Sequence, residues 1–409
     1  MNLTGHVTFQ KLWAAQAVSA FGARITREGL PIMAVVTLGA GAATLGVLAA
    51  VASGAALVAA LAAGPFIDRH RRRPLLIGAD LLRAAVLITI PLAAWLGVLT
   101  LPQVFAAAAL VAAASVAFDI ASHSYLPSII GKAELIDGNS RLAATESVAE
   151  VGGPALAGAL FQWLSAPIAL AANAVTYLAS AGFLAAIRTP EAAPEPSPPE
   201  HWTREVTEGF RLAWSDARVR PLLLMESAQG LFGGVFSALY VLFALRTLGL
   251  TPAMLGLAIG AGGIGALAGA FIAPRLARRL GHGRAIVLAM TGAALAVLIT
   301  PFAPAAPVTG LAALIVSQVI GDALAVAGGV LTASLRQTLL PQAVLGRVAG
   351  AFHAGAGAMA VIGALGGGLL GQAIGPRAAL LVAALGFLIP PLIGALSPLR
   401  DLGESVAVD

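Results

Sequence analysis

Several ionisable residues lie inside long apolar stretches of this chain, where a carboxylate could take up and release protons. Asp322 stands near the middle of one stretch, with Gln318 one helical turn away and no basic residue between Ile286 and Leu335. A carboxylate in hydrocarbon is costly to keep charged, so it binds protons near neutral pH, as a proton-exchanging carrier requires. The alternative is a structural aspartate that is permanently protonated or hydrogen-bonded.

A second group of charges, Arg24, Arg27 and Glu28, lies in the first apolar stretch. Arg24 and Glu28 are four residues apart, so they share one face of a helix and are predicted to neutralise each other. The remaining positive charge could bind an anionic group of a substrate or hold the carboxylate of Asp322 ionised. The competing interpretation is that these arginines reach out to the membrane interface.

Four further ionisable residues fall within apolar stretches. Asp119 and Glu226 are expected to line a cavity. Asp80 and Arg83, three residues apart, are expected to form a structural ion pair. The six histidines include no pair with the spacing of metal ligands, so no metal site is predicted.

Between two apolar stretches lies a compact basic turn that contains Gly64, Asp68, Arg69, Arg72 and Arg73. Arginine side chains cross hydrocarbon at high cost, so this turn is expected to stay in the cytosol. Asp68 could bind the positive end of a helix in the opposite half of the protein and latch the cytoplasmic side shut. Binding of the arginines to anionic lipid headgroups is the alternative.

The composition identifies an integral membrane protein. Hydrophobic residues make up 59% of the 409 residues and charged residues 11%, with a mean hydropathy of +0.91, whereas soluble proteins are about one quarter charged. The absence of cysteine excludes disulfides and thiolate chemistry. The arginines lie in short loops beside apolar stretches, so topology explains the high pI of about 10.4 better than nucleic-acid binding does.

Twelve apolar runs are long enough to cross a bilayer, which takes roughly 20 residues each. Their approximate limits are 9–38, 45–64, 75–97, 101–125, 144–163, 166–187, 220–245, 252–273, 284–302, 309–334, 348–371 and 376–396. They predict an all-α integral membrane protein of two pseudo-symmetric six-helix bundles, 1–188 and 220–409. Residues 189–219 are predicted to form a cytoplasmic linker that is first proline-rich and then an amphipathic interfacial helix with Trp202, Val206, Phe210 and Trp214 at four-residue spacing. The alternative for that helix is an ordinary soluble surface helix.

Internal repetition and charge support this topology. Gly64-Pro-Phe-Ile before the first arginine group matches Gly269-Ala-Phe-Ile before Arg275, about 205 residues later. Of 24 Lys and Arg residues, three fall inside spans and two in the predicted outer loops, which leaves nineteen on the other side. Both termini are therefore predicted to be cytoplasmic.

The basic turn resembles the loop 2–3 motif of the major facilitator superfamily, with Arg71 where glycine is usual. Phe118-Asp119 through Tyr125-Leu-Pro127, and Gly346-Arg347-Val348, are similar to twelve-span bacterial exporters of the macrolide-efflux and enterobactin-export type. The resemblance covers nearly the whole chain. It implies the major facilitator fold and a drug:proton antiporter of the bacterial inner membrane.

The fifth span contains Gly153, Pro154 and Gly158, which resemble the glycine-proline motif of antiporters. The proline frees a backbone carbonyl and bends the helix, while the glycines let a neighbour approach. Generic tight packing is the alternative. Glu146 and Glu150 are expected at the cytoplasmic start of this span, as gate or capping residues.

These patterns favour proton-coupled export of small hydrophobic or amphipathic compounds from an apolar cavity, by a monomer that contacts membrane lipids. Export of a siderophore or metabolite, lysolipid movement, and a receptor without transport stay open. We predict no cofactor and no enzymatic activity, because the spans contain no nucleophile with a matching base and the chain has no phosphate-binding glycine loop.

Overall fold

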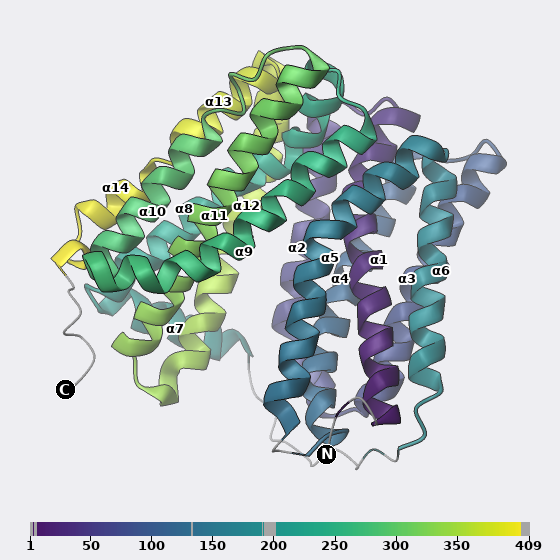
Figure 1. The fold of residues 1–409 in the computed structure, drawn as a ribbon, viewed down its shortest axis with the longest axis horizontal. Coiled ribbons are helices and arrows are strands. Elements are labelled where there is room, and N and C mark those ends of the chain that lie inside the picture. The colour runs from purple at the N-terminus through teal and green to yellow at the C-terminus, as the bar shows by residue number, and fades with distance from the viewer. Residues whose placement is uncertain (1–2, 4–5, 132–133, 190, 192–201, 402–409) are drawn as a thin grey trace. The chain divides into compact units, whose positions relative to one another are not determined.

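The computed structural model describes residues 3, 6–131, 134–189, 191 and 202–401 (Figure 1). All regular secondary structure in these residues is helical. The predicted all-α membrane fold is therefore confirmed.

Six long helices precede the central linker and are coloured purple to teal in Figure 1. They are α1 (Val7–Thr37), α2 (Ala42–Asp68), α3 (Arg72–Trp95), α4 (Leu101–Tyr125), α5 (Leu135–Trp163) and α6 (Ala166–Ala185). A short 3₁₀ turn, η2 (Leu126–Ser128), follows α4.

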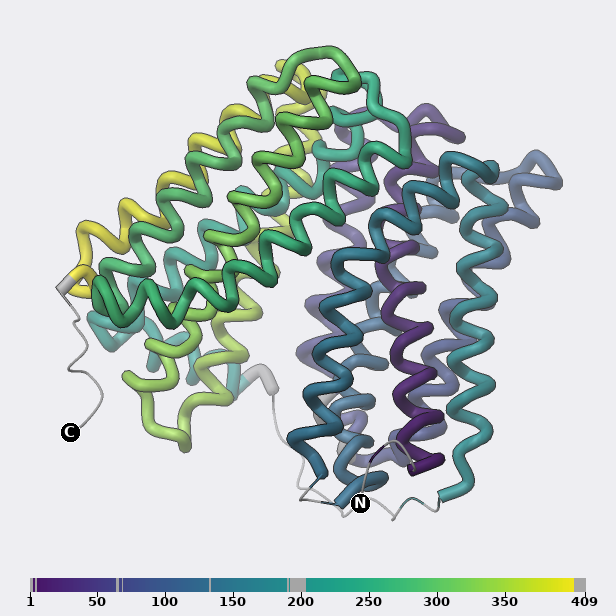
Figure 2. Tube along the Cα trace, in the orientation of Figure 1, coloured from purple at the N-terminus to yellow at the C-terminus, as the bar shows by residue number. Residues whose placement is uncertain are grey.

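The helices after the linker run from teal through green to yellow in the trace of Figure 2. They are α7 (Trp202–Ser215), α8 (Val219–Leu242), α9 (Pro252–Leu280), α10 (His282–Val297), α11 (Pro307–Leu339), α12 (Gln342–Ile374), α13 (Pro376–Gly386) and α14 (Ile389–Ala395). The π-helical turn η4 (Phe243–Thr247) continues α8, and η5 (Pro398–Asp401) follows α14.

Each predicted span coincides with a helix or a pair of helices. Within the described residues, nine helical segments are both long and apolar enough to cross a membrane. Helices α1 and α5 are long but carry several charges, and α10 is short. The last predicted span is divided into α13 and α14, where Pro390 and Pro391 occupy the first turn of α14 and cannot donate backbone hydrogen bonds.

Two helices begin well before their predicted limits. Helix α5 starts at Leu135 rather than 144, and α12 starts at Gln342 rather than 348. Because a polar first turn can project beyond an apolar span, the apolar run alone underestimates the length of such a helix. Glu146 and Glu150 therefore lie well inside α5, so neither caps this helix. Their place at the cytoplasmic start of the membrane span stays a prediction.

The chain forms two compact units. The first contains Met1–Ala40 and Val51–Glu200, and the second contains Gly41–Ala50 and His201–Asp409. Each has its own buried hydrophobic cluster, around Tyr125 in the first unit and around Phe352 in the second. The predicted limits of the two halves, at residues 188 and 220, stay a prediction.

Glycine allows close helix packing in the second unit. A Cβ atom added at Gly265 or Gly269 of α9 would meet the backbone carbonyl oxygen of Val319 or Ala323 in α11. Such backbone contact is typical of helices in lipid, where no hydrophobic effect drives their association. Helix α11 carries Asp322, so this packing fixes the position of that residue against α9.

The amphipathic helix α7 packs on α12. Glu208 accepts a hydrogen bond of 2.6 Å from Arg347, and a Cβ at Gly209 would meet the carbonyl oxygen of Arg347. Ala213 is buried in the hydrophobic cluster of the second unit, whereas Trp214 is exposed. Helix α7 is thus a packed part of the second unit; the side chain of Trp202 lies outside the described residues.

Candidate functional site

A buried ion pair lies inside the first unit. Asp80 and Arg83, one turn apart in α3, form a salt bridge with side chains that are 0% and 1% exposed. The guanidinium carbon of Arg83 lies 4.5 Å from the ring centre of Phe118 in α4 and 4.4 Å from that of Tyr177 in α6. The predicted ion pair is present, and its cation is held between two aromatic faces.

Hydrogen bonds extend this pair into α1 and α4. Arg83 donates from Nη2 to Ser19 at 3.0 Å and from Nη1 to Ser115 at 3.3 Å. Ser19 in turn donates to Asp80 at 3.3 Å. The pair therefore joins three helices, which explains how two charges persist in a buried position.

A second polar cluster joins α1 to α6. Asn173 donates hydrogen bonds of 2.6 Å to Thr26 and 3.0 Å to the carbonyl oxygen of Gly22. The hydroxyl groups of Thr26 and Tyr177 lie 3.3 Å apart. Because the Tyr177 ring also contacts Arg83, the two clusters form one continuous polar core.

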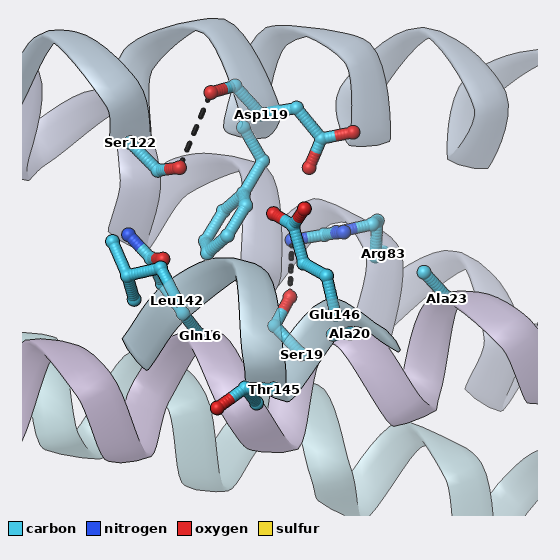
Figure 3. A pocket seen from close by; sticks show the side chains of 11 residues that line it. Gln16, Ser19, Ala20, Ala23, Arg83, Asp119, Ser122, Leu142, Thr145 and Glu146 are labelled. Carbon is cyan, nitrogen blue, oxygen red and sulfur yellow. Dashed lines mark hydrogen bonds between the residues drawn. The ribbon is translucent and has the colours of Figure 1, made fainter. Parts of the chain in front are cut away.

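A pocket opens beside Arg83 in the first unit (Figure 3). Four helices line it, with these residues: Gln16, Ser19, Ala20 and Ala23 of α1; Arg83 of α3; Phe118, Asp119 and Ser122 of α4; and Leu142, Thr145 and Glu146 of α5. Asp119 and Glu146 are both exposed. The structure thus places Asp119 at a pocket of the first unit that is more polar than the apolar cavity predicted from the sequence. The place of Asp119 in a transport cavity stays a prediction.

Helices α1 and α5 are linked by ion pairs. Arg24 forms a salt bridge with Glu150, and Arg27 contacts Glu28 at 2.9 Å and Glu150 at 3.4 Å. The predicted pairing of Arg24 with Glu28 was therefore wrong, because α5 brings Glu150 beside Arg24. Sequence spacing reveals partners on one helix only, so Glu150 was misassigned.

The glycine-proline stretch of α5 lies at this same contact. Gly153, Pro154 and Gly158 are all buried, and a Cβ at Gly153 would meet the Arg24 side chain. Pro154 cannot donate a backbone hydrogen bond to the carbonyl of Glu150, four residues earlier. Gly153 thus provides space for Arg24 next to its ionic partner.

In the second unit, Asp322 and Gln318 of α11 face α9. A Cβ at Gly262 would meet Asp322 Oδ2 and would lie 3.3 Å from the Cβ of Gln318. The absence of a side chain at Gly262 therefore leaves room for the carboxylate. Asp322 is half-buried.

Glu226 of α8 has a partner that the sequence did not suggest. Its Oε2 lies 3.6 Å from Nη1 of Arg336 in α11, and the Arg336 guanidinium lies 4.6 Å from the ring centre of Phe352. The side chains of Glu226 and Arg336 are 29% and 13% exposed. Arg336 falls just beyond the predicted span 309–334, whereas helix α11 continues to Leu339. An arginine two residues after the apolar run was the only sign of this residue in the sequence.

The arginines of the basic turn contact their own unit. Arg73 donates to the carbonyl oxygens of Leu184 at 3.0 Å and Ala185 at 2.7 Å, at the end of α6. Glu191 accepts from the backbone N–H groups of Arg72 at 2.6 Å and Arg73 at 3.1 Å. Arg69 is exposed. The side chains at positions 64 and 68, on which the predicted latch depends, lie outside the described residues.

Metal binding has no support in the described part of the chain, where no group of three or more His, Asp or Glu side chains could hold an ion. In the second unit, Glu226 is paired with Arg336, and Asp322 lies against α9. Such sites suit proton transfer and electrostatic binding.

Known proteins resemble this chain in sequence over most of its length. A family model described as Major Facilitator Superfamily matches residues 12–353. The chain is 29% identical over 370 residues to a protein named Multidrug efflux pump Tap from Mycobacterium tuberculosis (strain ATCC 25618 / H37Rv), which covers 86% of this chain and 85% of that protein. The protein of the same name from Mycolicibacterium fortuitum is 28% identical over 357 residues, with 85% of each covered.

Solved structures agree on the fold. The nucleoside transporter NupG (D323A mutant) superposes with a TM-score of 0.80 at 12% identity, over 95% of this chain and 99% of the other. A bacterial homologue of the iron transporter ferroportin superposes with a TM-score of 0.76 at 17% identity, over 95% and 98%. At these identities the likeness concerns the fold alone.

Proposed function

Because this chain belongs to the Major Facilitator Superfamily and is a multi-pass membrane protein, we propose that it exports small hydrophobic or amphipathic compounds in exchange for protons. The observation that carries this proposal is the likeness, along 86% of the chain, to proteins named Multidrug efflux pump Tap. The proposal includes the direction of transport, its coupling to protons, a monomeric state and the absence of enzymatic activity.

Asp322 is our proposed proton-binding residue, with Gln318 beside it. Its support is a carboxylate that lies on a membrane helix, in space left by Gly262. We also propose that the carboxylates of Asp119 and Glu226 line the transport cavity. Three further residues are proposed to modulate the charge of that cavity: Arg24, Arg27 and Glu28. In alternating access, halves 1–188 and 220–409 would rock about a central site, connected by the cytoplasmic linker 189–219.

For localisation, we propose the bacterial inner membrane with both termini in the cytoplasm. The support is the crowding of arginines on one side of the predicted topology. In the basic turn we propose that Gly64 and Asp68 act at the cytoplasmic gate together with the exposed Arg69. For Arg72 and Arg73 the contacts with the end of α6 and with Glu191 favour a role within the first half.

The test is substrate-dependent proton movement in proteoliposomes, with a panel of hydrophobic antibiotics and iron chelators. We expect at least one antibiotic to drive proton flux in the wild type and Asp322→Asn to abolish it, because the amide cannot titrate. Asp137→Asn removes an exposed carboxylate from the first turn of α5 and serves as the matched control, with flux retained.

The outcomes separate the parts of the proposal. Coupled flux that persists in Asp322→Asn would remove Asp322 as the proton site and direct attention to Asp119 and Glu226. Flux with chelators alone would indicate export of a siderophore. Absence of flux with every compound would contradict proton-coupled export.

A further inference from the structure

The turn between α9 and α10 is strongly basic. Only Gly281 separates the two helices. Four arginines lie at this second basic turn: Arg275, Arg278, Arg279 and Arg284. All four side chains are exposed. The salt bridges of the second unit instead join other arginines to Glu208, Asp216 and Glu226. In the described part of the chain, the second basic turn therefore presents four positive charges without a carboxylate partner.

The corresponding turn of the first unit is accompanied by acidic residues. There, Gly64-Pro-Phe-Ile is followed by Asp68, whereas the matching Gly269-Ala-Phe-Ile is followed by the buried Ala273. Glu191 also accepts hydrogen bonds from two backbone N–H groups of the first turn. The second copy of the repeat thus keeps the arginines but not the acid, and its guanidinium groups are open to an anion from outside the chain.

Exposed apolar side chains lead to this turn along both helices. On α9, Phe271 is 70% exposed and lies one turn before Arg275, which donates a hydrogen bond of 2.7 Å to its carbonyl oxygen. On α10, Leu288 and Leu295 are 55% and 54% exposed and follow Arg284 by one and three turns. Exposed apolar side chains of membrane helices contact acyl chains, so the arginines lie where the acyl chains end and the headgroups begin.

The phosphate of a lipid fits this arrangement better than a dissolved anion does. Guanidinium groups bind phosphate oxygens through paired hydrogen bonds. Basic residues beside a membrane helix also attract anionic lipids of the cytoplasmic leaflet. A free phosphate would contact the arginines alone, whereas a phospholipid would also cover the exposed side chains of Phe271 and Leu288.

We propose that the second basic turn is a binding site for an anionic phospholipid. The lipid phosphate accepts hydrogen bonds from the arginines of both helices, and the acyl chains lie along Phe271 of α9 and Leu288 and Leu295 of α10. The lipid thereby supplies the negative charge that the second copy of the repeat lacks. This inference is independent of the proposed export function, because it concerns a surface of the second unit and not the transported compound.

The test is a lipid titration of the full-length protein in a non-ionic detergent, followed by native mass spectrometry. Phosphatidylglycerol and phosphatidylethanolamine with the same oleoyl chains are compared, because only the first carries a net negative charge. We expect phosphatidylglycerol to bind about tenfold or more tightly, as attraction of an anionic lipid by several arginines allows. An excess of glycerol 3-phosphate, which has the phosphate but no acyl chains, is expected to leave the bound lipid in place.

Paired substitutions locate the site. The double variant Arg278→Gln with Arg284→Gln removes one charge from each helix and is expected to weaken phosphatidylglycerol binding roughly 30-fold. The matched control, Arg204→Gln with Arg211→Gln, removes two exposed charges from α7 and is expected to retain the affinity. Replacement of Arg278 and Arg284 by Lys keeps the charge and is expected to retain most of the binding, which separates loss of the site from loss of the fold.

Equal affinity of the wild type for the two lipids would overturn the inference, because the charge of the headgroup would then be irrelevant. An equal loss of binding in the α7 control would also overturn it, since any exposed arginine would then serve. Displacement of phosphatidylglycerol by glycerol 3-phosphate would indicate a site for a dissolved phosphate instead of a lipid. Binding is measured without transport, so each of these results leaves the export proposal unaffected.

Discussion

Arg83 derives its place in the molecule from contacts on four helices. Its ion pair with Asp80 lies within α3, its two serine partners lie in α1 and α4, and its aromatic neighbours Phe118 and Tyr177 lie in α4 and α6. Phe118 directly precedes Asp119 in the pocket wall. The buried cation therefore both stabilises the first unit and holds the turn of α4 that carries Asp119.

Replacement of Arg83 by Met is expected to destabilise the protein by roughly 3–5 kcal/mol, because Asp80 would remain buried without its counter-charge. The measurement is the midpoint of unfolding in mild detergent, compared with Arg71→Met at an exposed position. The double variant Asp80→Asn with Arg83→Met is expected to recover part of the loss. A single variant as stable as Arg71→Met would show that the pair contributes little.

The other ion pairs show that residue spacing alone does not predict the partner of a charged side chain. Arg24 and Glu28 satisfy the i, i+4 rule, yet Arg24 binds Glu150 and Glu28 binds Arg27. The local rule is worth only about 0.2–0.5 kcal/mol per pair, so a partner on a packed neighbouring helix readily displaces it. Arg336 with Glu226 is the equivalent case in the second unit.

At the scale of elements, helix ends in the first unit are completed by distant segments. The N-cap residue of α3, Arg71, makes no side-chain capping bond, and Glu191 supplies the carboxylate instead. The C-terminal end of α6 is completed in the same way. Its last carbonyl groups accept hydrogen bonds from Arg73, and Lys11 donates a hydrogen bond of 2.7 Å to the carbonyl oxygen of Ala186. Each helix dipole thus meets a charge of the opposite sign.

Replacement of Glu191 by Gln removes the charge from this cap while keeping its size. We expect a loss of about 1 kcal/mol in stability, the usual effect of a capping residue, and faster hydrogen exchange at the amides of Arg72 and Arg73. Exchange is followed by mass spectrometry on the protein in nanodiscs. The control is Glu195→Gln in the same proline-rich stretch. Equal exchange in both variants would exclude Glu191 as the cap of α3.

At the scale of the whole molecule, the absence of cysteine makes the proposed orientation directly testable. Ser165 lies in the connection between α5 and α6, and Ser128 in the connection between α4 and α5; both are exposed. Because successive connections of a multi-span protein alternate between the two sides of the membrane, these positions are expected to face opposite compartments.

We expect a membrane-impermeant maleimide to label Ser165→Cys in cells with a permeabilised outer membrane, and to label Ser128→Cys only after the inner membrane is opened. Labelling is read by a mass shift of the purified protein. The reverse pattern would place both termini outside the cytoplasm and overturn the assignment of the basic turn.

The sequence by itself determined the fold class, because apolar runs of membrane-spanning length and the distribution of arginines are properties of the linear chain. It also identified Asp80 with Arg83 as an ion pair, since the two residues lie one turn apart within an apolar span. The polar character of the pocket, the partner of Glu226 and the capping role of Glu191 were decided only by the tertiary structure. These depend on contacts between helices far apart in the chain, where the neighbour that supplies the opposite charge is set by packing and not by spacing.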